Sequence, residues 1–445
     1  MTVSPQTNGQ KTIPTLWRES ILKRDFEIVL GKMLQPDQGR EEETEEPYLR
    51  SANVQWEGVD LSDMKTMWFS PAEKRDLLLR EGDLVVNEGG DVGRCAIWRD
   101  VPESFYFQNA VNRIRARTSA STRFLYYWLF NLKHAGFIDA MVSRITIAHL
   151  TAEKLARVPW PNVPSAEQQR IAAYLDASCA AIDAAVAAKR RQLETLDALR
   201  KSIITRALTL GLKPNVRTRP SGQDWLGAIP QHWSPLCLKR LLREPLTYGL
   251  NEAAELEDRD SPRYLRITDF DDDGTLRDDT FRSLPWEVAR GALLQPDDVL
   301  FARSGATVGK TFMFRNYSGV ACFAGYLIRA RTLPWKLDAQ FLYLFTKTLT
   351  YEAWKNLIFT QATIQNISAA KYNYLTIPVP PLPEQQAIVA HVQKTDGEFR
   401  RLAIQIEAQI ATLAAYRKSL IHECVTGQRR IFETDLNHVK APWLS

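Results

Sequence analysis

An internal repeat is the feature that most constrains how this 445-residue chain folds. Glu167-Gln168-Gln169 recurs as Glu384-Gln385-Gln386, and Arg200-Lys201-Ser202 recurs as Arg417-Lys418-Ser419, both displaced by 217 residues. The Phe124-Leu125-Tyr126 segment returns with the same displacement. A constant long displacement predicts two copies of one structural unit rather than a single large core.

Upstream of residue 124 the copies persist, but the displacement drifts. The tetrapeptide IRAR at 114–117 returns at 328–331, a displacement of 214 residues, and YLR at 48–50 returns at 264–266, a displacement of 216. We therefore expect the repeated unit to extend through the upstream part of each copy.

Two kinds of segment alternate along the chain. Residues 12–160 and 214–378 are mixed, aromatic-rich and full of turn signals, whereas 165–210 and 384–428 have long helical patterns. Each helical stretch follows a proline-rich hinge, VPWPNVP or IPVPPLP, and each ends at a glycine, Gly211 or Gly427. Prolines before a helix and a glycine after it are typical boundary signals. Ser165 is expected to be an N-cap, with Gln168 completing a capping box.

Apolar residues in the two helical stretches repeat every seven positions, which predicts coiled-coil packing. About 45 residues at about 1.5 Å each give rods of roughly 65–70 Å. Two unrelated amphipathic helices on separate cores are the alternative. The expected seam contains Leu175, Ile182, Lys189, Leu196 and Ile203 with Val392, Phe399, Ile406, Leu413 and Leu420, flanked by Ile171, Val186, Leu193 and Leu199.

The segment SGATVGKT at 304–311 resembles a phosphate-binding loop with one residue missing. Such a loop delivers phosphate to a helix N-terminus, but the following TFMFRNYSG is not helical in pattern. The counterpart GDLVVNEGGDVGR at 82–94 keeps the glycines and ends in Arg94 where the second copy has Lys310. We expect a backbone turn that presents one cation to a phosphate; a plain glycine-rich hairpin is the alternative.

Composition excludes several classes of protein. The net charge is +5, from 57 Lys+Arg against 52 Asp+Glu, which permits but does not establish nucleic-acid binding. The five cysteines lack CxxC spacing and the six histidines lack HExxH spacing, so no metal site is expected. The polar N-terminus and the absence of a long apolar run predict neither a signal peptide nor a membrane span. The widely spaced cysteines support no disulfide framework, which predicts a protein of the reducing cytoplasm.

The combined pattern resembles the specificity (S) subunit, or HsdS family, of type I restriction–modification systems. The resemblance lies in the duplicated architecture, the Pro-x-x-Glu-Gln-Gln start of each long helix, the Arg-Lys-Ser near each helix end and the glycine turns. The segment DWLGAIPQHW at 224–233 is similar to the usual start of that family's second variable domain. Departures are Asn87-Glu88 where Arg303-Ser304 stand in the second copy, and Ser165-Ala166 in the first hinge.

The resemblance implies an α+β fold with an internal pseudo-two-fold repeat. Two mixed α/β target-recognition domains would be separated by two long helices that pair as an antiparallel coiled coil. The expected boundaries are residues 1–160 for the first domain, with 1–12 disordered, 161–213 for the first helix, 214–378 for the second domain, 379–428 for the second helix, and 429–445 for a tail.

The resemblance also implies a function without catalysis in this chain. Each domain would read one half of a gapped duplex DNA target, and the two half-sites would differ. The helices would set the spacing and dock two methyltransferase (modification) subunits, and the complex would recruit restriction subunits. S-adenosylmethionine, ATP and Mg²⁺ would belong to those partners, so no cofactor is expected here.

Polar side chains on loops of a rigid scaffold are the natural readers of DNA. Arg reads guanine, Asn and Gln read adenine, and Lys neutralises phosphate; each candidate is equally compatible with a solvated loop. The second copy supplies Arg303, Ser304, Lys310, Thr360, Gln361 and Asn366, and the first supplies Asn87, Arg94, Ser143, Arg144 and His149. The arginines of the IRAR segments could approach phosphate or form a charged strand edge.

Candidates for docking partner subunits lie near the ends of the helical stretches. They are Glu167, Gln168, Gln169, Arg200, Lys201, Glu384, Gln385, Gln386, Arg417 and Lys418. The paired glutamines are equally consistent with local helix caps.

Two other functions remain open from sequence. A coiled-coil protein scaffold without DNA readout predicts no salt-dependent duplex binding, whereas phosphate contacts predict affinity that falls steeply with salt. A self-contained nuclease or methyltransferase would need catalytic motifs that the sequence lacks.

Overall fold

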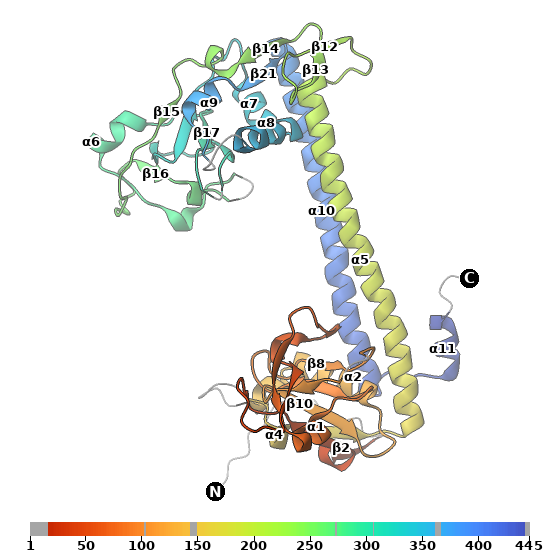
Figure 1. The fold of residues 1–445 in the computed structure, drawn as a ribbon. Helices are drawn as coiled ribbons and strands as arrows, with labels where there is room; N and C mark the ends of the chain where they lie inside the picture. Colours follow the sequence, from red (N-terminus) through yellow and green to blue (C-terminus); the bar gives the residue numbers. More distant parts are fainter. Residues whose placement is uncertain are drawn as a thin grey trace. The chain divides into compact units, whose positions relative to one another are not determined.

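The computed structural model describes residues 17–101, 104–142, 149–271, 274–305, 307–360 and 366–440, without the side chains of 360 and 438–440. The chain divides into two compact units. Unit 1 consists of Met1–Lys189 with Ala408–Ser445, and unit 2 of Arg190–Glu407. Each unit contains small sheets, short helices and one part of each of two long helices, α5 (Ser165–Leu210) and α10 (Leu382–Val425) (Figure 1).

Unit 1 is built around a four-stranded antiparallel sheet of order β2-β10-β7-β8. Helix α2 packs beside it, and two smaller sheets, β6-β3-β9 and β1-β11, flank it. The elements are β1 (Arg18–Ile21), β2 (Phe26–Leu30), β3 (Thr44–Leu49), β4 (Val54–Gln55), β5 (Gly58–Val59), β6 (Lys65–Phe69), α1 (Pro71–Leu77), β7 (Leu84–Asn87), β8 (Cys95–Ile97), β9 (Tyr106–Phe107), β10 (Val111–Ala116), α2 (Thr122–His134), α3 (Phe137–Met141), α4 (Ala152–Ala156), β11 (Pro159–Asn162) and α11 (Glu433–Lys440).

Unit 2 repeats this plan with the sheet order β15-β20-β17-β18. Its strand pair β14-β21 matches β1-β11, and its parallel pair β16-β19 matches β3-β9. The elements are β12 (Thr218–Pro220), β13 (Ala228–Pro230), β14 (Ser234–Cys237), β15 (Thr247–Tyr248), β16 (Arg263–Leu265), α6 (Trp286–Ala289), β17 (Val299–Ala302), β18 (Thr311–Met313), β19 (Ala321–Phe323), β20 (Leu327–Ala330), α7 (Ala339–Phe345), α8 (Leu349–Thr360), α9 (Ala369–Asn373) and β21 (Thr376–Val379). The predicted α+β class and the internal repeat are confirmed.

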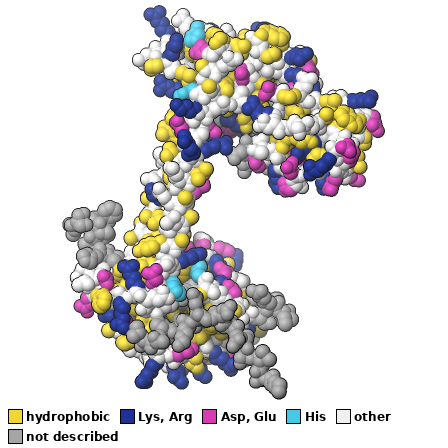
Figure 2. Space-filling view, turned by 180° about the vertical axis from the view of Figure 1, so that it is seen from behind, with side chains coloured by type: hydrophobic (Ala, Val, Ile, Leu, Met, Phe, Trp, Pro, Cys, Tyr) yellow, Lys and Arg dark blue, Asp and Glu magenta, His cyan; other side chains and the backbone are white. Residues whose placement is uncertain are grey.

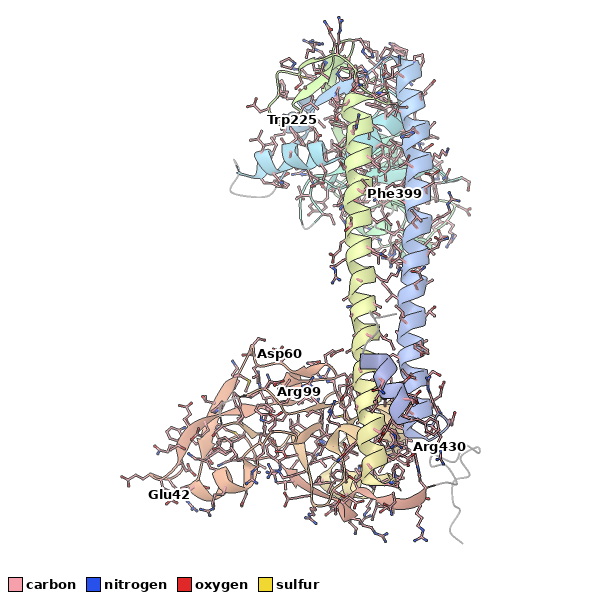
Figure 3. The ribbon with its side chains drawn as sticks, turned by 90° about the vertical axis from the view of Figure 1, so that its right-hand side faces the viewer. Glu42, Asp60, Arg99, Trp225, Phe399 and Arg430 are labelled. Atoms are coloured by element: carbon pink, nitrogen blue, oxygen red, sulfur yellow. The ribbon has the colours of Figure 1, made fainter. Side chains whose placement is uncertain are left out.

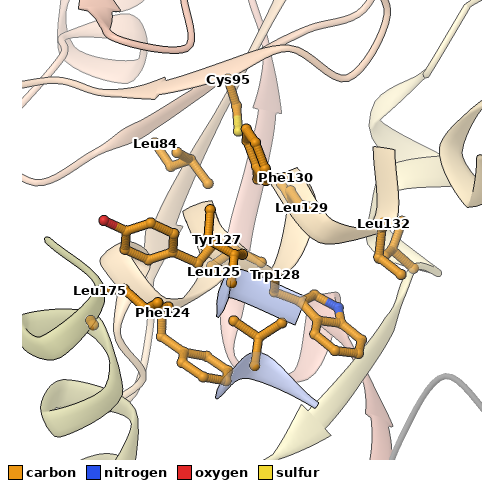
Figure 4. Packing of buried hydrophobic residues seen from close by; sticks show 14 of the residues in the cluster. Leu84, Cys95, Phe124, Leu125, Tyr127, Trp128, Leu129, Phe130, Leu132 and Leu175 are labelled. Atoms are coloured by element: carbon orange, nitrogen blue, oxygen red, sulfur yellow. The ribbon is translucent and has the colours of Figure 1, made fainter. Parts of the chain in front are cut away.

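Burial of aromatic and aliphatic side chains holds each unit together. In unit 1, Phe124, Tyr127 and Trp128 of α2 belong to one buried cluster with Leu84 of β7 and Leu175 of α5 (Figure 4). Unit 2 buries the equivalent α7 residues together with Trp233 and Tyr372. The base of each long helix is therefore part of the hydrophobic core of the domain from which it emerges.

The structure corrects the predicted alignment of the IRAR segments. Arg115 binds the buried Asp83 at 2.7 and 2.6 Å, and Arg331 binds the buried Asp298 at 2.8 Å through two bonds. Arg115 therefore corresponds to Arg331, a displacement of 216 residues rather than 214. These two arginines anchor the central strands and are part of the scaffold.

The two long helices pack against each other in antiparallel register within each unit (Figures 1 and 3). In unit 1, Arg417 of α10 lies 3.2 Å from Asp183 of α5. In unit 2, Arg200 binds Asp396 at 2.6 Å. The predicted helix pairing is confirmed.

The predicted seam is deeply buried only near the domains. Leu175, Val392 and Leu420 are fully buried, whereas Leu196 and Phe399 are half-buried because there the helices contact only each other. Leu199, which we expected to flank the seam, is 51% exposed, so this expectation was wrong.

The expectation that no helix could span a membrane was too strict. The most apolar 18-residue window of α5 has a mean hydropathy of 1.5, and 33% of that window is buried within the structure. A single helix of this kind is weak evidence for a span, because the core helix of a globular domain passes the same test.

The middle glutamine of each Glu-Gln-Gln motif joins a long helix to the domain before it. Gln168 accepts from the Ser121 amide and donates to the Val163 carbonyl, both at 2.8 Å. Gln385 accepts from the Asp338 amide at 2.8 Å and donates to the Lys336 and Pro380 carbonyls at 2.8 and 2.9 Å. The capping box expected at Ser165 does not form at the start of α5, because Ser165 is already the first residue of the helix. Its hydroxyl donates to the Ser119 carbonyl instead.

Replacement of Gln385 by alanine is expected to destabilise unit 2 by about 1–3 kcal/mol, because buried hydrogen-bonding groups lose their partners. Gln386→Ala, which removes the neighbouring exposed glutamine, is the matched control and is expected to change stability little. Thermal unfolding of the two variants measures the difference. Equal stabilities would show that the Gln385 contacts do not hold the helix to the domain.

Candidate nucleic-acid interface

A glycine turn occurs at the same place in both units. In unit 1 it follows β7: the Asn87 amide donates to the Arg94 carbonyl at 2.8 Å, and the Gly93 amide donates to the Asn87 carbonyl at 2.9 Å. In unit 2 it follows β17: Ala302 and Lys310 make the first bond at 2.8 Å, and Gly309 and Ala302 make the second at 2.8 Å. Gly90, Gly93, Gly305 and Gly309 all have φ between +73° and +82°, which disfavours residues with a Cβ.

The unit 2 turn is not a nucleotide-binding loop. Strand β18 begins at Thr311, directly after Lys310, and pairs antiparallel with β17. A phosphate-binding loop requires a helix at this point. Each of the two segments is a β-hairpin turn that ends in a cationic residue, Arg94 in unit 1 and Lys310 in unit 2.

The hydrogen bonds of the turns correct one predicted equivalence. Asn87 corresponds to Ala302 rather than to Arg303, and Glu88, which the sequence comparison set against Ser304, corresponds to Arg303. Asn87 is fully buried and donates to the Ser51 carbonyl at 3.0 Å, so it braces a loop and cannot read DNA in this conformation. The single-residue gap in the aligned turns was the only sequence signal that could have revealed Glu88.

The unit 2 turn places Arg303 next to a cluster of polar and aromatic residues. The guanidinium lies over the Tyr248 ring, 4.9 Å from its centroid, and the Tyr248 hydroxyl accepts from the Ala369 amide at 2.9 Å. Ser304 forms a backbone bridge with Asn366. The Arg303 amide donates to the carbonyl of Tyr326, whose side chain is 64% exposed. The structure thus brings together the predicted residues Arg303, Ser304 and Asn366.

The corresponding surface of unit 1 has a different charge. Glu88 is 8% exposed, and burial raises the pKa of its carboxyl group. The Nδ1 atom of His149 lies 3.9 Å from Glu88 Oε1. Arg94 donates to the Gln55 side-chain carbonyl at 3.0 Å and lies 3.6 Å from Asp91. His149 belongs to this surface as predicted, whereas the charge of Arg94 is partly offset by Asp91.

The remaining predicted contacts cannot be placed. Ser143, Arg144 and Gln361 lie outside the described residues, and the side chain of Thr360, at the end of α8, is also outside them.

Lysines that the sequence reasoning missed gather at the unit 2 turn. Lys347 donates to the Thr311 carbonyl at 2.9 Å, and its ammonium lies 4.6 Å from the Tyr343 ring centroid. Although much of this residue is exposed, removal of its ammonium from water and the charges of Lys310 and Lys355 lower the pKa of Lys347 to about 8. No sequence pattern linked Lys310, Lys347 and Lys355, because they lie in the glycine turn, in the α7–α8 connection and in α8.

The predicted docking residues divide into two groups. Gln168 and Gln385 are buried in the contacts described above, and Arg200 and Arg417 pair with aspartates of the partner helix, so these four hold the fold together. Gln169, Lys201, Gln386 and Lys418 are exposed, and Glu167 and Glu384 are half-buried, with Glu384 2.9 Å from His232.

A groove of about 330 Å³ lies between α5 and α10 in unit 2. Leu193, Leu196, Ala403 and Ile404 line it together with Phe399, which is labelled in Figure 3. Hydrophobic side chains are also exposed along the helices in the space-filling view (Figure 2). Across the described ranges no group of three or more His, Cys, Asp or Glu residues could hold a metal ion.

Comparison with known proteins agrees with this geometry. The family model for the type I restriction modification DNA specificity domain matches residues 17–195 and 289–412. The EcoBI specificity subunit of Escherichia coli is 23% identical over 358 residues, which cover 78% of this chain and 73% of that protein.

Solved structures support the fold. A chain from work on complex assembly and conformational transition of the type I restriction–modification system is 17% identical, with a TM-score of 0.71, over 94% of this chain and 99% of that chain. The HsdS subunit from Thermoanaerobacter tengcongensis is 18% identical, with a TM-score of 0.53, over 94% of this chain and 98% of that one. With the family model matched over more than half of its length, this chain belongs to the type I restriction–modification DNA specificity family, whose members are the non-catalytic specificity subunits of the complex.

Proposed function

We propose that each unit of this chain reads one half of a gapped, two-part duplex DNA target. The observation that carries the proposal is a duplicated loop scaffold with different side chains. The same backbone hydrogen bonds hold the glycine turn in both units, but Glu88 and His149 stand where unit 2 has Arg303 and Asn366. A shared scaffold with different polar groups predicts two different half-sites.

The revised contact set follows from the position of the candidates at the two glycine turns. In unit 2 it comprises Arg303, Ser304, Lys310 and Asn366, together with Lys347 and Lys355, and in unit 1 Glu88, Arg94 and His149. Lysines and Arg94 would position the duplex through phosphates, and the others would face base edges. Ser143, Arg144, Thr360 and Gln361 remain proposed contacts on the basis of sequence alone.

The long helices are proposed to set the spacing between the half-sites and to dock modification subunits, one for each half of the chain. Support for docking comes from the groove between α5 and α10, which apolar and charged side chains line together, and from the nearby exposed Leu402 and Ile404, 47% and 64% accessible. Exposed apolar surface next to charged residues is typical of protein interfaces. Lys201, Gln386 and Lys418 would contribute the polar rim. Restriction subunits would join this complex, which we place in the cytoplasm.

Affinity for duplex DNA is expected to fall about two- to fivefold as pH rises from 7 to 9. A change of this size corresponds to the free energy that one exposed ion pair contributes. Phosphate binding favours protonated Lys347, whose pKa of about 8 means that it loses its charge in this interval. The charged groups that face its ammonium are Lys310, Lys355 and Glu352. Titrations at constant ionic strength measure the change, and Lys347→Arg should remove it. Lys239→Arg is the control, because Lys239 also lies over a tyrosine, Tyr374, at 4.2 Å. An unchanged pH dependence in Lys347→Arg would exclude Lys347 from the interface.

A genome-wide map of methylated adenines, in cells with and without this chain, tests the proposed function. Loss of a single gapped, two-part motif is the expected result and would identify both half-sites. An unchanged map in cells whose modification subunit is active would favour the scaffold alternative.

A further inference from the structure

One position of the recognition surface carries opposite charges in the two units. The Glu88 amide donates to the Ala110 carbonyl, and the Glu88 carbonyl accepts from the Leu150 amide, both at 2.9 Å. The Arg303 amide donates to the Tyr326 carbonyl at 3.0 Å, and its carbonyl accepts from the Ile367 amide at 2.9 Å. The two side chains therefore leave equivalent points of the same scaffold.

Both side chains hold polar atoms without a partner among the described residues. These atoms are Glu88 Oε2 and Arg303 Nε. Buried polar atoms are nearly always hydrogen-bonded in folded proteins, and exceptions often mark a binding site. His149 is the titratable group nearest to Glu88, but at 3.9 Å it is beyond hydrogen-bond distance.

We propose that residues 88 and 303 are equivalent specificity-determining residues, with Arg303 reading a guanine and Glu88 reading a base amino group. Arginine donates two bonds to guanine O6 and N7, and a carboxylate accepts from an exocyclic amino group such as cytosine N4. Phosphate repels a carboxylate, so a base edge is the part of the duplex that suits Glu88. This inference rests on the proposed function and adds the base chemistry at one position of each half-site.

Tyr248 is the positioning residue for Arg303. Its ring lies under the guanidinium, and its hydroxyl is held by the Ala369 amide. Leu30 occupies the same strand position in unit 1, where β2 pairs with β10 as β15 pairs with β20. Stacking restricts the guanidinium to a plane, which favours a two-bond contact with guanine over a single-charge contact with phosphate.

The test uses the assembled methyltransferase complex and maps methylated adenines for each variant. Arg303→Gln is expected to relax the preference for guanine at a single position of one half-site by about 5- to 150-fold, the range for one two-bond base contact. Glu88→Gln is expected to relax a single position in the other half-site. Tyr248→Leu should weaken the same guanine preference as Arg303→Gln, whereas Tyr248→Phe, which keeps the stack, should largely preserve it.

The controls remove charge at exposed positions outside the two turns. Arg290→Gln and Glu19→Gln are expected to leave the methylated motif unchanged, because both residues are exposed in other elements of the two units. Thermal unfolding checks that each variant folds. If Arg303→Gln does not fold, Arg303→Lys decides the question, since it keeps the charge but loses the two-bond geometry and should still relax the guanine position.

The outcomes separate this inference from the proposed function. An unaltered motif in folded Arg303→Gln or Arg303→Lys, and in Glu88→Gln, would overturn the assignment while leaving the chain as a specificity subunit. Absence of motif-specific methylation with the unaltered chain and active partners would overturn the proposed function itself.

Discussion

Replacement of Asp298 by alanine is expected to lower the free energy of unfolding of unit 2 by about 3–5 kcal/mol, the cost of breaking a buried ion pair from one side. The Asp298 carboxylate is 1% exposed, accepts two bonds from Arg331 at 2.8 Å and accepts the Gln295 amide at 2.8 Å. Without the Asp298 carboxylate, the partly buried Arg331 keeps the ion pair with Glu244, at 2.6 Å. The lost ion pair joins the start of β17 to the end of β20, the two central strands of the sheet.

An exposed pair of the same length is the matched control. Asp279 lies 2.8 Å from Arg277, and both side chains are largely exposed, so Asp279→Ala should cost no more than about 1 kcal/mol. Hydrogen exchange of β17 and β20 amides measures the stability of unit 2 by itself, because a chain with two units need not unfold in one step. Equal effects of the two substitutions would mean that burial does not strengthen the Asp298 pair.

Replacement of Gly249 by alanine is expected to destabilise unit 2 by about 3 kcal/mol, at the upper end of the usual cost of overpacking. A Cβ at Gly249 would overlap the carbonyl oxygens of Phe323 and Ala324, and these backbone atoms cannot rotate away. The chain at Gly249 would have to move away from the end of β19 and carry the adjacent Tyr248 with it. Recognition of the second half-site should therefore weaken together with stability.

The control for Gly249 is Gly291→Ala, because a Cβ at Gly291 meets no atom within 4 Å. Thermal unfolding and the methylation map should both be close to those of the unaltered chain for Gly291→Ala. A Gly249→Ala chain of unaltered stability would show that β15 tolerates the displacement.

Much of the candidate site could be predicted from sequence, but the assignment of individual residues could not. The glycine turns, Arg303, Ser304, Asn366 and His149 follow from the repeat. The repeat did not show that Glu88, rather than Asn87, corresponds to Arg303. The two turns differ in length, and only the backbone hydrogen bonds identify which residues are equivalent. Lys347 and Lys355 could not be predicted from the repeat, because tertiary packing brings the α7–α8 connection and helix α8 to the turn.

The sequence by itself determined the duplication, the α+β class and the paired helices. The reason is that a constant displacement and a seven-residue period can be recognised without knowing which residues are in contact. The tertiary structure alone decided the register of the strands. A two-residue shift along a strand leaves every side chain on the same face of the sheet. The two IRAR segments could therefore be aligned at the wrong displacement from sequence alone. The equivalent ion pairs of Arg115 with Asp83 and of Arg331 with Asp298 identify the correct one. The tertiary structure likewise decided that Gln168 and Gln385 hold the helices to the domains, because the Ser121 and Asp338 amides that donate to them lie 47 residues earlier in the chain.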